Sequence, residues 1–281
     1  MRSLRQIKDI IRNVAKDKKL NSQVLLRNYM MERLLERISL SKYNKNFILK
    51  GGMLVSSFVG IESRMTVDMD TTIKDKALNI TTIKEVLFDI MSLDIGDGVI
   101  FTLEKIDEIR DEADYTGYRV SIESRLDAAR IPLKIDITTG DKITPKEQLH
   151  QYELFLENRT IEIYSYNIET VLAEKLETII SRNVTNTRMR DFYDIYILLS
   201  MLTENINDSI FRDALQATAD SRGSKKFLKD GMEVIQEVLH DEIIKSHWQR
   251  YQKKYEYAKE VSWEMISKSL EELWFLYKDK Y

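Results

Sequence analysis

The stretch from Phe47 to Thr72 (FILKGGMLVSSFVGIESRMTVDMDTT) constrains the fold more than any other part of the chain. It opens with a short apolar run typical of a strand and passes through Gly51 and Gly52 into an apolar segment with helical character. A second β-like run follows. Paired glycines leave backbone N–H groups open at the start of a helix, where anions are favoured. The stretch therefore predicts a strand, a helix with an anion site at its N-terminus, and a second strand.

Two carboxylates mark the second β-like run. Asp68 and Asp70 are two residues apart, and alternate side chains of a strand share one face at a spacing of about 6.6 Å. Met69 would point the other way, into the core. Paired carboxylates suit hard cations such as Mg²⁺, which prefers oxygen ligands and substrate phosphates. Acidic pairs at strand ends are often only solvated, so it is the combination with the two glycines that favours nucleotide chemistry.

A third carboxylate lies far along the chain, in the β-rich segment Arg130–Thr138. Asp136 is flanked by isoleucines and therefore projects from the face opposite to theirs. It could face water on an edge strand. Alternatively, a third acid near the metal could ligate a cation and take the proton from an attacking hydroxyl.

The chain changes character after the β-rich segments and is helical in pattern from Asn167 to the end. We expect two domains, residues 1–160 and 161–281. Lys175 lies beside the apolar stripe of the first C-terminal helix, so it either extends along that surface to water or points into a cleft. In the N-terminal half, Arg27, Arg33 and Arg37 are interpreted as a solvated helix face, with part of a basic groove for an acceptor nucleic acid as the alternative.

Composition limits the classes of function. The 281 residues contain no cysteine, which excludes disulfides and thiolate metal sites and fits a reducing cytoplasm. No apolar run approaches the roughly 20 residues that a membrane span needs. The net charge of −3 provides no global basic field, so any RNA contact needs a local patch, for which Arg182, Arg188 and Arg190 are the candidates.

Several motifs together resemble the nucleotidyltransferase toxins of the AbiEii/AbiGii type, which belong to the polymerase β-like nucleotidyltransferase superfamily. The matching segments are LKGG at Leu49–Gly52, RMTVDMD at Arg64–Asp70, KIDI at Lys134–Ile137, EKL at Glu174–Leu176 and RDxxD at Arg190–Asp194. One departure is Met53, where the superfamily usually has serine after the glycine. Backbone amides, or the hydroxyls of Ser56 and Ser57, would have to replace that serine.

The resemblance implies an α+β fold: a polymerase β-like core with a small mixed sheet and helices, followed by an all-helical C-terminal domain, with the nucleotide held between them. It also implies the site. The expected ligands for Mg²⁺ or Mn²⁺ are Asp68, Asp70 and Asp136, the last of which also activates the acceptor. Asp191 or Asp194 would orient Lys175 or the nucleotide. The expected nucleotide contacts are Gly51, Gly52, Met53, Thr66, Lys175 and Arg190.

The function implied is that of a toxin in a toxin–antitoxin or abortive-infection (phage defence) system. Such a toxin transfers a nucleoside monophosphate from an NTP to an acceptor, with the tRNA 3′ end as the first candidate. A cognate antitoxin encoded alongside would restrain it, and a hydroxyl near Thr66 can be a target of regulatory phosphorylation. Two alternatives stay open: modification of a small molecule such as an aminoglycoside, and a catalytically inactive nucleotide-binding partner protein.

Overall fold

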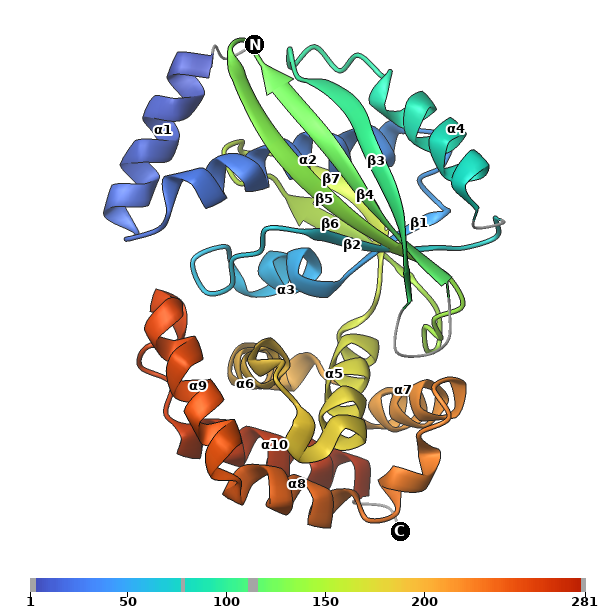
Figure 1. Cartoon of the computed structure of the whole chain (residues 1–281), viewed down its shortest axis with the longest axis vertical. Helices are drawn as coiled ribbons and strands as arrows, with labels where there is room; N and C mark the ends of the chain where they lie inside the picture. Colours follow the sequence, from blue (N-terminus) through green and yellow to red (C-terminus); the bar gives the residue numbers. More distant parts are fainter. Residues whose placement is uncertain (1–3, 77–78, 111–115, 279–281) are drawn as a thin grey trace. The chain divides into compact units, whose positions relative to one another are not determined.

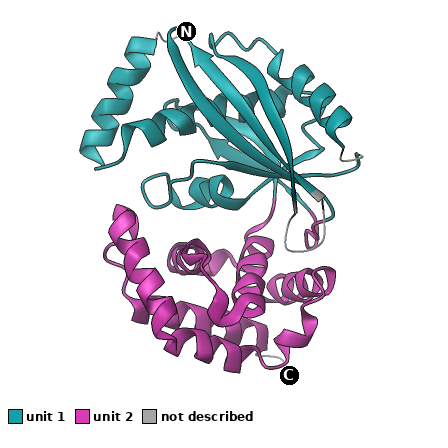
Figure 2. Cartoon of the chain, viewed as in Figure 1, with its two compact units in different colours: residues 1–140, 147–165 teal, residues 141–146, 166–281 magenta. Residues whose placement is uncertain are grey.

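The computed structural model describes residues 4–76, 79–110 and 116–278. The chain forms two compact units (Figure 2), residues 1–140 with 147–165 and residues 141–146 with 166–281. We call them unit 1 and unit 2. No helix in the described ranges combines the length and the apolar character needed to cross a bilayer.

Unit 1 is built on a mixed seven-stranded sheet with the order β3-β4-β5-β2-β1-β7-β6 (Figure 1). The pairs β2–β5 and β1–β7 are parallel, and the other neighbours are antiparallel. The strands are β1 (Phe47–Lys50), β2 (Met69–Ile73), β3 (Ile100–Arg110), β4 (Thr116–Leu126), β5 (Ala129–Thr138), β6 (Gln148–Glu153) and β7 (Thr160–Ser165).

Four helices complete unit 1: α1 (Leu4–Asp17), α2 (Ser22–Leu40), α3 (Gly51–Val59) and α4 (Ile80–Met91). Helix α2 packs on β5 and β7, α4 packs on α2 and β3, and α3 packs on β1 and β2. Asn21 begins α2 by accepting hydrogen bonds from the backbone N–H groups of Gln23 and Val24. Met69 is fully buried, as the alternation in its strand predicts.

Unit 2 is helical apart from its connections. Its α-helices are α5 (Ile168–Arg182), α6 (Met189–Leu202), α7 (Asp208–Ser221), α8 (Gly231–His240), α9 (Glu242–Lys254) and α10 (Trp263–Lys278). Helix α5 packs on α6 and α7, and α10 packs on α6, α7 and α8. The short segment 141–146 belongs here because the carbonyl of Thr144 accepts from Asn167 Nδ2 at 2.6 Å and from Thr170 Oγ1 at 3.1 Å, at the start of α5.

Buried charge on α2 corrects one sequence interpretation. Arg33 and Arg37 are each only 2% exposed, so they form neither a solvated face nor an open basic groove. Arg37 makes two 2.8 Å hydrogen bonds to Asp97, and Arg33 Nη1 lies 2.8 Å from Glu157. Their acidic partners lie far along the chain, which is why helical periodicity alone could not show that these arginines are buried.

Glu32 is a buried carboxylate whose protonation is coupled to folding. Both of its oxygens lie 3.1 Å from the backbone nitrogen of Phe155, and it is hydrogen-bonded to the side chain of Tyr152. Burial raises the pKa of Glu32 to about 8, with a smaller rise from the charge of Glu157, while the two hydrogen bonds and the charge of Arg33 partly lower it. Because the folded-state pKa lies above the unfolded value of 4.5, this group's contribution to stability is complete below pH 4.5. That contribution is lost as the pH rises through 8.

We expect Glu32→Gln to remove this pH dependence. The parent should lose about 3–5 kcal/mol of unfolding free energy from Glu32 between pH 5 and pH 9, whereas a neutral amide loses none. Urea unfolding at both pH values measures the difference. Glu104→Gln, which removes an exposed carboxylate from β3, is the control and should follow the parent. Parallel pH profiles for Glu32→Gln and the parent would contradict the prediction.

Candidate active site

Strand register brings four charged side chains into one row across the sheet of unit 1. Asp70 on β2 is paired with Asp136 on β5, Lys50 on β1 is paired with Asp70, and Arg119 on β4 is paired with Asp136. Register partners on adjacent strands lie about 4.8 Å apart and share a face of the sheet. We call Arg119, Asp136, Asp70 and Lys50 the charged row. Two carboxylates that are far apart in the sequence thus stand side by side, with a cation at each end.

The pKa of Asp70 is raised by its surroundings. Burial, then the charge of Asp136 and more weakly that of Asp68, raise the pKa of Asp70, while Lys50 and the N–H of Gly52 oppose the rise. Strand β2 begins at Met69, so Asp68 immediately precedes the strand and does not lie within it. All three predicted carboxylates therefore lie close enough to influence one another electrostatically.

Asp136 is held by an arginine. Arg119 Nε donates to Asp136 Oδ1 at 2.8 Å, and Arg119 Nη2 donates to Asp136 Oδ2 at 2.6 Å. The side chain of Asp136 is 19% exposed and that of Arg119 is 45% exposed. Hydrogen bonding to Asp136 raises the pKa of Arg119 above its usual range, and the charges of Asp68 and Asp70 add to this effect.

The paired glycines are required by what packs against them. Gly51 has a φ of +65°, and a Cβ there would lie 2.1 Å from Asp70 Oδ2. A Cβ on Gly52 would lie 2.8 Å from Thr66 Oγ1. The N–H of Gly52 donates to Asp70 Oδ2 at 3.3 Å, so the N-terminus of α3 already receives a carboxylate of the protein itself.

The hydroxyls proposed to replace the missing serine lie elsewhere. Met53 is 1% exposed and packs in the core, so only its backbone could contact a ligand. Ser56 is buried, and Ser57 Oγ is engaged with the carbonyl of Leu54 at 2.7 Å and with His150 Nε2 at 2.9 Å. Ser57 lies six residues, or about 9 Å, beyond the start of α3. Backbone amides therefore remain as the anion contacts at this helix start.

Thr66 braces the loop that leads into β2. It is 2% exposed, its carbonyl accepts from Asn28 Nδ2 at 2.8 Å, and its hydroxyl donates to the carbonyl of Asp68 at 3.2 Å. In this conformation the hydroxyl is covered by Gly52 and the loop. Phosphorylation there would need the loop to open first.

Lys175, Asp191 and Asp194 come together within unit 2. Lys175 Nζ on α5 lies 2.6 Å from Asp194 Oδ2 and 3.2 Å from Asp191 Oδ1, both on α6. Asp194 is fully buried and Asp191 is 3% exposed. The two acids therefore hold the ammonium group of Lys175, which does not extend to water. Arg188 pairs with Asp191 at 2.8 Å.

Arg190 contacts the aromatic ring of Tyr255. Its Nη2 donates to Tyr255 Oη at 3.3 Å, and its Cζ lies 5.9 Å from the centre of the Tyr255 ring. Arg190, together with Lys254, lowers the pKa of the Tyr255 hydroxyl against the effect of burial. This is part of the basic patch that the sequence predicts on α6.

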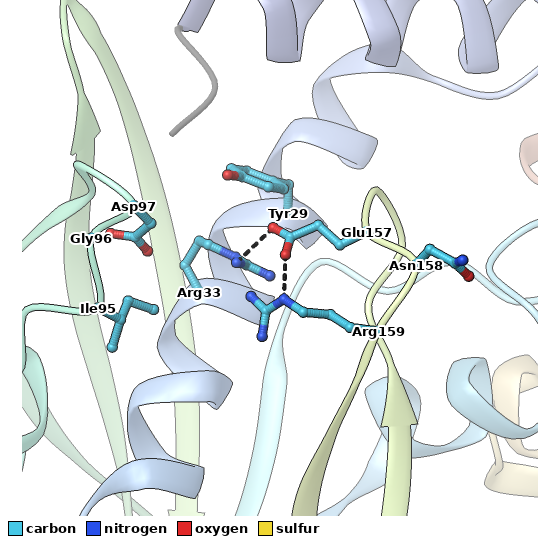
Figure 3. Close-up of a pocket in the computed structure, with 8 residues that line it drawn as sticks. All are labelled: Tyr29, Arg33, Ile95, Gly96, Asp97, Glu157, Asn158 and Arg159. Atoms are coloured by element: carbon cyan, nitrogen blue, oxygen red, sulfur yellow. Dashed lines mark hydrogen bonds and ion pairs between the residues drawn. The ribbon is translucent and has the colours of Figure 1, made fainter.

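A separate pocket lies in unit 1, and none of the predicted site residues lines it (Figure 3). Arg33 Nη1 pairs with Glu157 at 2.8 Å and with Glu36 at 3.0 Å. Arg159 pairs with the same two glutamates at 2.5 Å each. These two arginines and two glutamates form a closed, charge-balanced ring. We assign it to holding α2 against the β6–β7 turn.

Comparisons with known proteins identify the family and the fold. The family model described as nucleotidyl transferase AbiEii toxin, type IV toxin–antitoxin system, matches residues 33–272. Among solved structures, MenT4, a nucleotidyltransferase toxin from Mycobacterium tuberculosis, is similar with a TM-score of 0.58 and 12% identity over 96% of this chain and 98% of that chain. JHP933 from Helicobacter pylori is similar with a TM-score of 0.50 and 18% identity over 92% and 94%. No curated protein matches. The expected family resemblance and α+β fold are confirmed.

Gly51→Ala tests the close approach between the helix start and Asp70. The added methyl group has to displace the Asp70 carboxylate and also adopt a positive φ, so we expect a loss of about 2–4 kcal/mol in unfolding free energy. Gly96→Ala is the matched control, because Gly96 also has a positive φ but open space around it. It should lose only about 1 kcal/mol. Equal losses in urea unfolding would show that the contact with Asp70 is unimportant.

Lys175→Met tests the buried ion pairs of unit 2. Removing the cation leaves Asp194 buried without its lysine partner, and we expect a loss of about 3–5 kcal/mol. Lys175→Met combined with Asp194→Asn should recover part of that loss, because no charge then stays uncompensated at this position. Thermal and urea unfolding measure both variants. If the single variant keeps the parent's stability, the cluster does not stabilise unit 2.

Proposed function

This chain belongs to the AbiEii family of nucleotidyltransferase toxins of type IV toxin–antitoxin systems, and we propose that it transfers a nucleoside monophosphate from an NTP to an acceptor hydroxyl. The first candidate for the acceptor is the 3′ end of tRNA. The observation that carries the proposal is the pairing of Asp70 with Asp136 beside the glycine start of α3. Carboxylates beside a helix N-terminus are what a nucleotide bound through a cation requires.

The donor set of the charged row fits a divalent cation. Carboxylate oxygens are the ligands that Mg²⁺ and Mn²⁺ prefer. Burial is the largest cause of the raised pKa of Asp70, and the charges of Asp136 and Asp68, which a cation would offset, add to it. In residues 4–76, 79–110 and 116–278, no group of three or more His, Cys, Asp or Glu side chains is already arranged to hold a metal ion. We propose Asp68, Asp70 and Asp136 as the ligands. When bound, the cation would stabilise charge on the attacking and leaving oxygens.

The residues of the chain have separate roles in the proposed transfer. Asp136 takes the proton of the acceptor hydroxyl. The acceptor oxygen forms a bond to the α-phosphorus, the bond from that phosphorus to the bridging oxygen breaks, and pyrophosphate leaves with the electron pair. Backbone amides of Gly51, Gly52 and Met53 receive phosphate oxygens at the start of α3.

Residues of unit 2 contribute positive charge in this proposal. Lys175, oriented by Asp191 and Asp194, neutralises nucleotide phosphates, and Arg190 beside Tyr255 contacts the nucleotide. We propose that the protein acts in the cytoplasm in defence against phage and that an antitoxin encoded alongside restrains it. Thr66 is a candidate for regulation by phosphorylation.

A second candidate is a catalytically inactive nucleotide-binding protein. Met53 supplies no hydroxyl at the helix start, and the N–H of Gly52 is already directed at Asp70. Modification of a small molecule such as an aminoglycoside is a third. These possibilities differ in which molecule, if any, receives the nucleotide. The experiment therefore measures where a labelled nucleotide is attached.

The test incubates the protein and Mg²⁺ with each α-labelled NTP and total RNA. We expect label in RNA, and we expect Asp70→Asn and Asp136→Asn to lower its incorporation by several powers of ten, since each 1.36 kcal/mol of lost transition-state stabilisation is tenfold. Asp9→Asn, an exposed carboxylate on α1, should leave transfer unchanged. Label that reaches an added aminoglycoside but not RNA would favour the small-molecule function. If the Asp70→Asn variant is still toxic to cells, the catalytically inactive nucleotide-binding function is favoured.

A further inference from the structure

We propose that Arg119 is a positioning residue that holds Asp136 in the metal-free protein and competes with the divalent cation for the Asp136 carboxylate. The inference rests on the proposed function, because it concerns the same three carboxylates. None of the sequence motifs described above includes Arg119.

The contact is a specific one. Two nitrogens of the guanidinium reach the two oxygens of Asp136 at 2.8 and 2.6 Å, which is the parallel, bidentate geometry of the strongest arginine–carboxylate pairs. The register of β4 with β5 places the two residues directly opposite each other. Arg119 is therefore held by the sheet in the position from which it can engage both oxygens.

The contact is also one that can open. Arg119 is 45% exposed and reaches the row from β4, on the side of Asp136 away from Asp70, whereas Asp136 is 19% exposed. A long arginine side chain that is partly in water can leave while the carboxylate stays in place. A dication bound to Asp136 would repel the adjacent guanidinium, so ligation and the ion pair oppose each other.

Arg119 partly neutralises the negative charge of the three carboxylates. Asp68, Asp70 and Asp136 together carry three negative charges when ionised, against the two positive charges of Lys50 and Arg119. Without a cation, the two hydrogen bonds from Arg119 fix the orientation of the Asp136 carboxylate.

Mn²⁺ titration of the full-length protein, with no nucleotide, measures the competition. Free Mn²⁺ is followed by electron paramagnetic resonance at neutral pH and about 0.15 M salt, where charges more than about 8 Å apart are largely screened. We expect Arg119→Gln to bind Mn²⁺ about five- to tenfold more tightly than the parent, because it removes a charge-assisted, partly exposed pair. Arg119→Lys keeps the charge but loses the fork and should fall between them.

Arg125→Gln is the matched control. Arg125 lies on the same strand and the same face as Arg119, about 20 Å along β4, and its removal changes the net charge by the same amount. It should bind Mn²⁺ as the parent does. In an Asp136→Asn background, Arg119→Gln should lose most of its effect, because the carboxylate for which the two cations compete is gone. Circular dichroism and melting temperature confirm that each variant is folded.

The outcomes separate this inference from the proposed function. If Arg119→Gln binds Mn²⁺ as the parent does or more weakly, while Asp70→Asn weakens binding, Arg119 is a structural partner only and the inference is overturned. The proposed function then stands. If neither the parent nor Arg119→Gln binds Mn²⁺, both the inference and the metal-dependent chemistry fail. Tighter binding by Arg119→Gln in a protein that labels no acceptor would support the inference and overturn the function.

Discussion

The repulsion between Asp70 and Asp136 is the constraint on which unit 1 depends. Parallel pairing of β2 with β5 sets two carboxylates side by side, partly out of water, where like charges are costly. Three features offset this electrostatic cost: Lys50 at one end of the row, Arg119 at the other, and the N-terminus of α3, where the N–H of Gly52 donates to Asp70. Glycine at position 51 is what lets the helix start approach Asp70 closely.

Much of this region could be predicted from sequence because its pattern is local. The apolar run, the two glycines and the alternation around Met69 specify β1, α3 and β2 without any knowledge of the rest of the chain. Family motifs added Asp136 and the cluster of Lys175 with Asp191 and Asp194. Local pattern also misled: Asp68 precedes the strand, and the hydroxyls of α3 face the core or His150 instead of the helix start.

What the sequence could not provide is the register between distant segments. Alternation along β4 shows that Arg119 leaves the core face, but only the pairing of β4 with β5 shows that it meets Asp136. The same limit explains Arg33 and Arg37. Polar spacing on a helix is typical of a solvated face, and their burial depends on acids contributed by the β6–β7 turn and by the loop after α4. Ion-pair partners that are far apart in sequence leave no signature at either position.

The path of the chain between the units has a consequence for how the protein is made. Residues 141–146 join unit 2, the chain then returns to unit 1 for β6 and β7, and it finally leaves again at residue 166. On the ribosome, the last two strands of the sheet emerge only after residues 141–146 of the helical unit have emerged. The carbonyl of Thr144 has its two hydrogen-bond donors only once Asn167 and Thr170 have been synthesised. No single cut in the chain therefore separates unit 1 from unit 2 with both complete, because each unit is made of two separate stretches of the sequence.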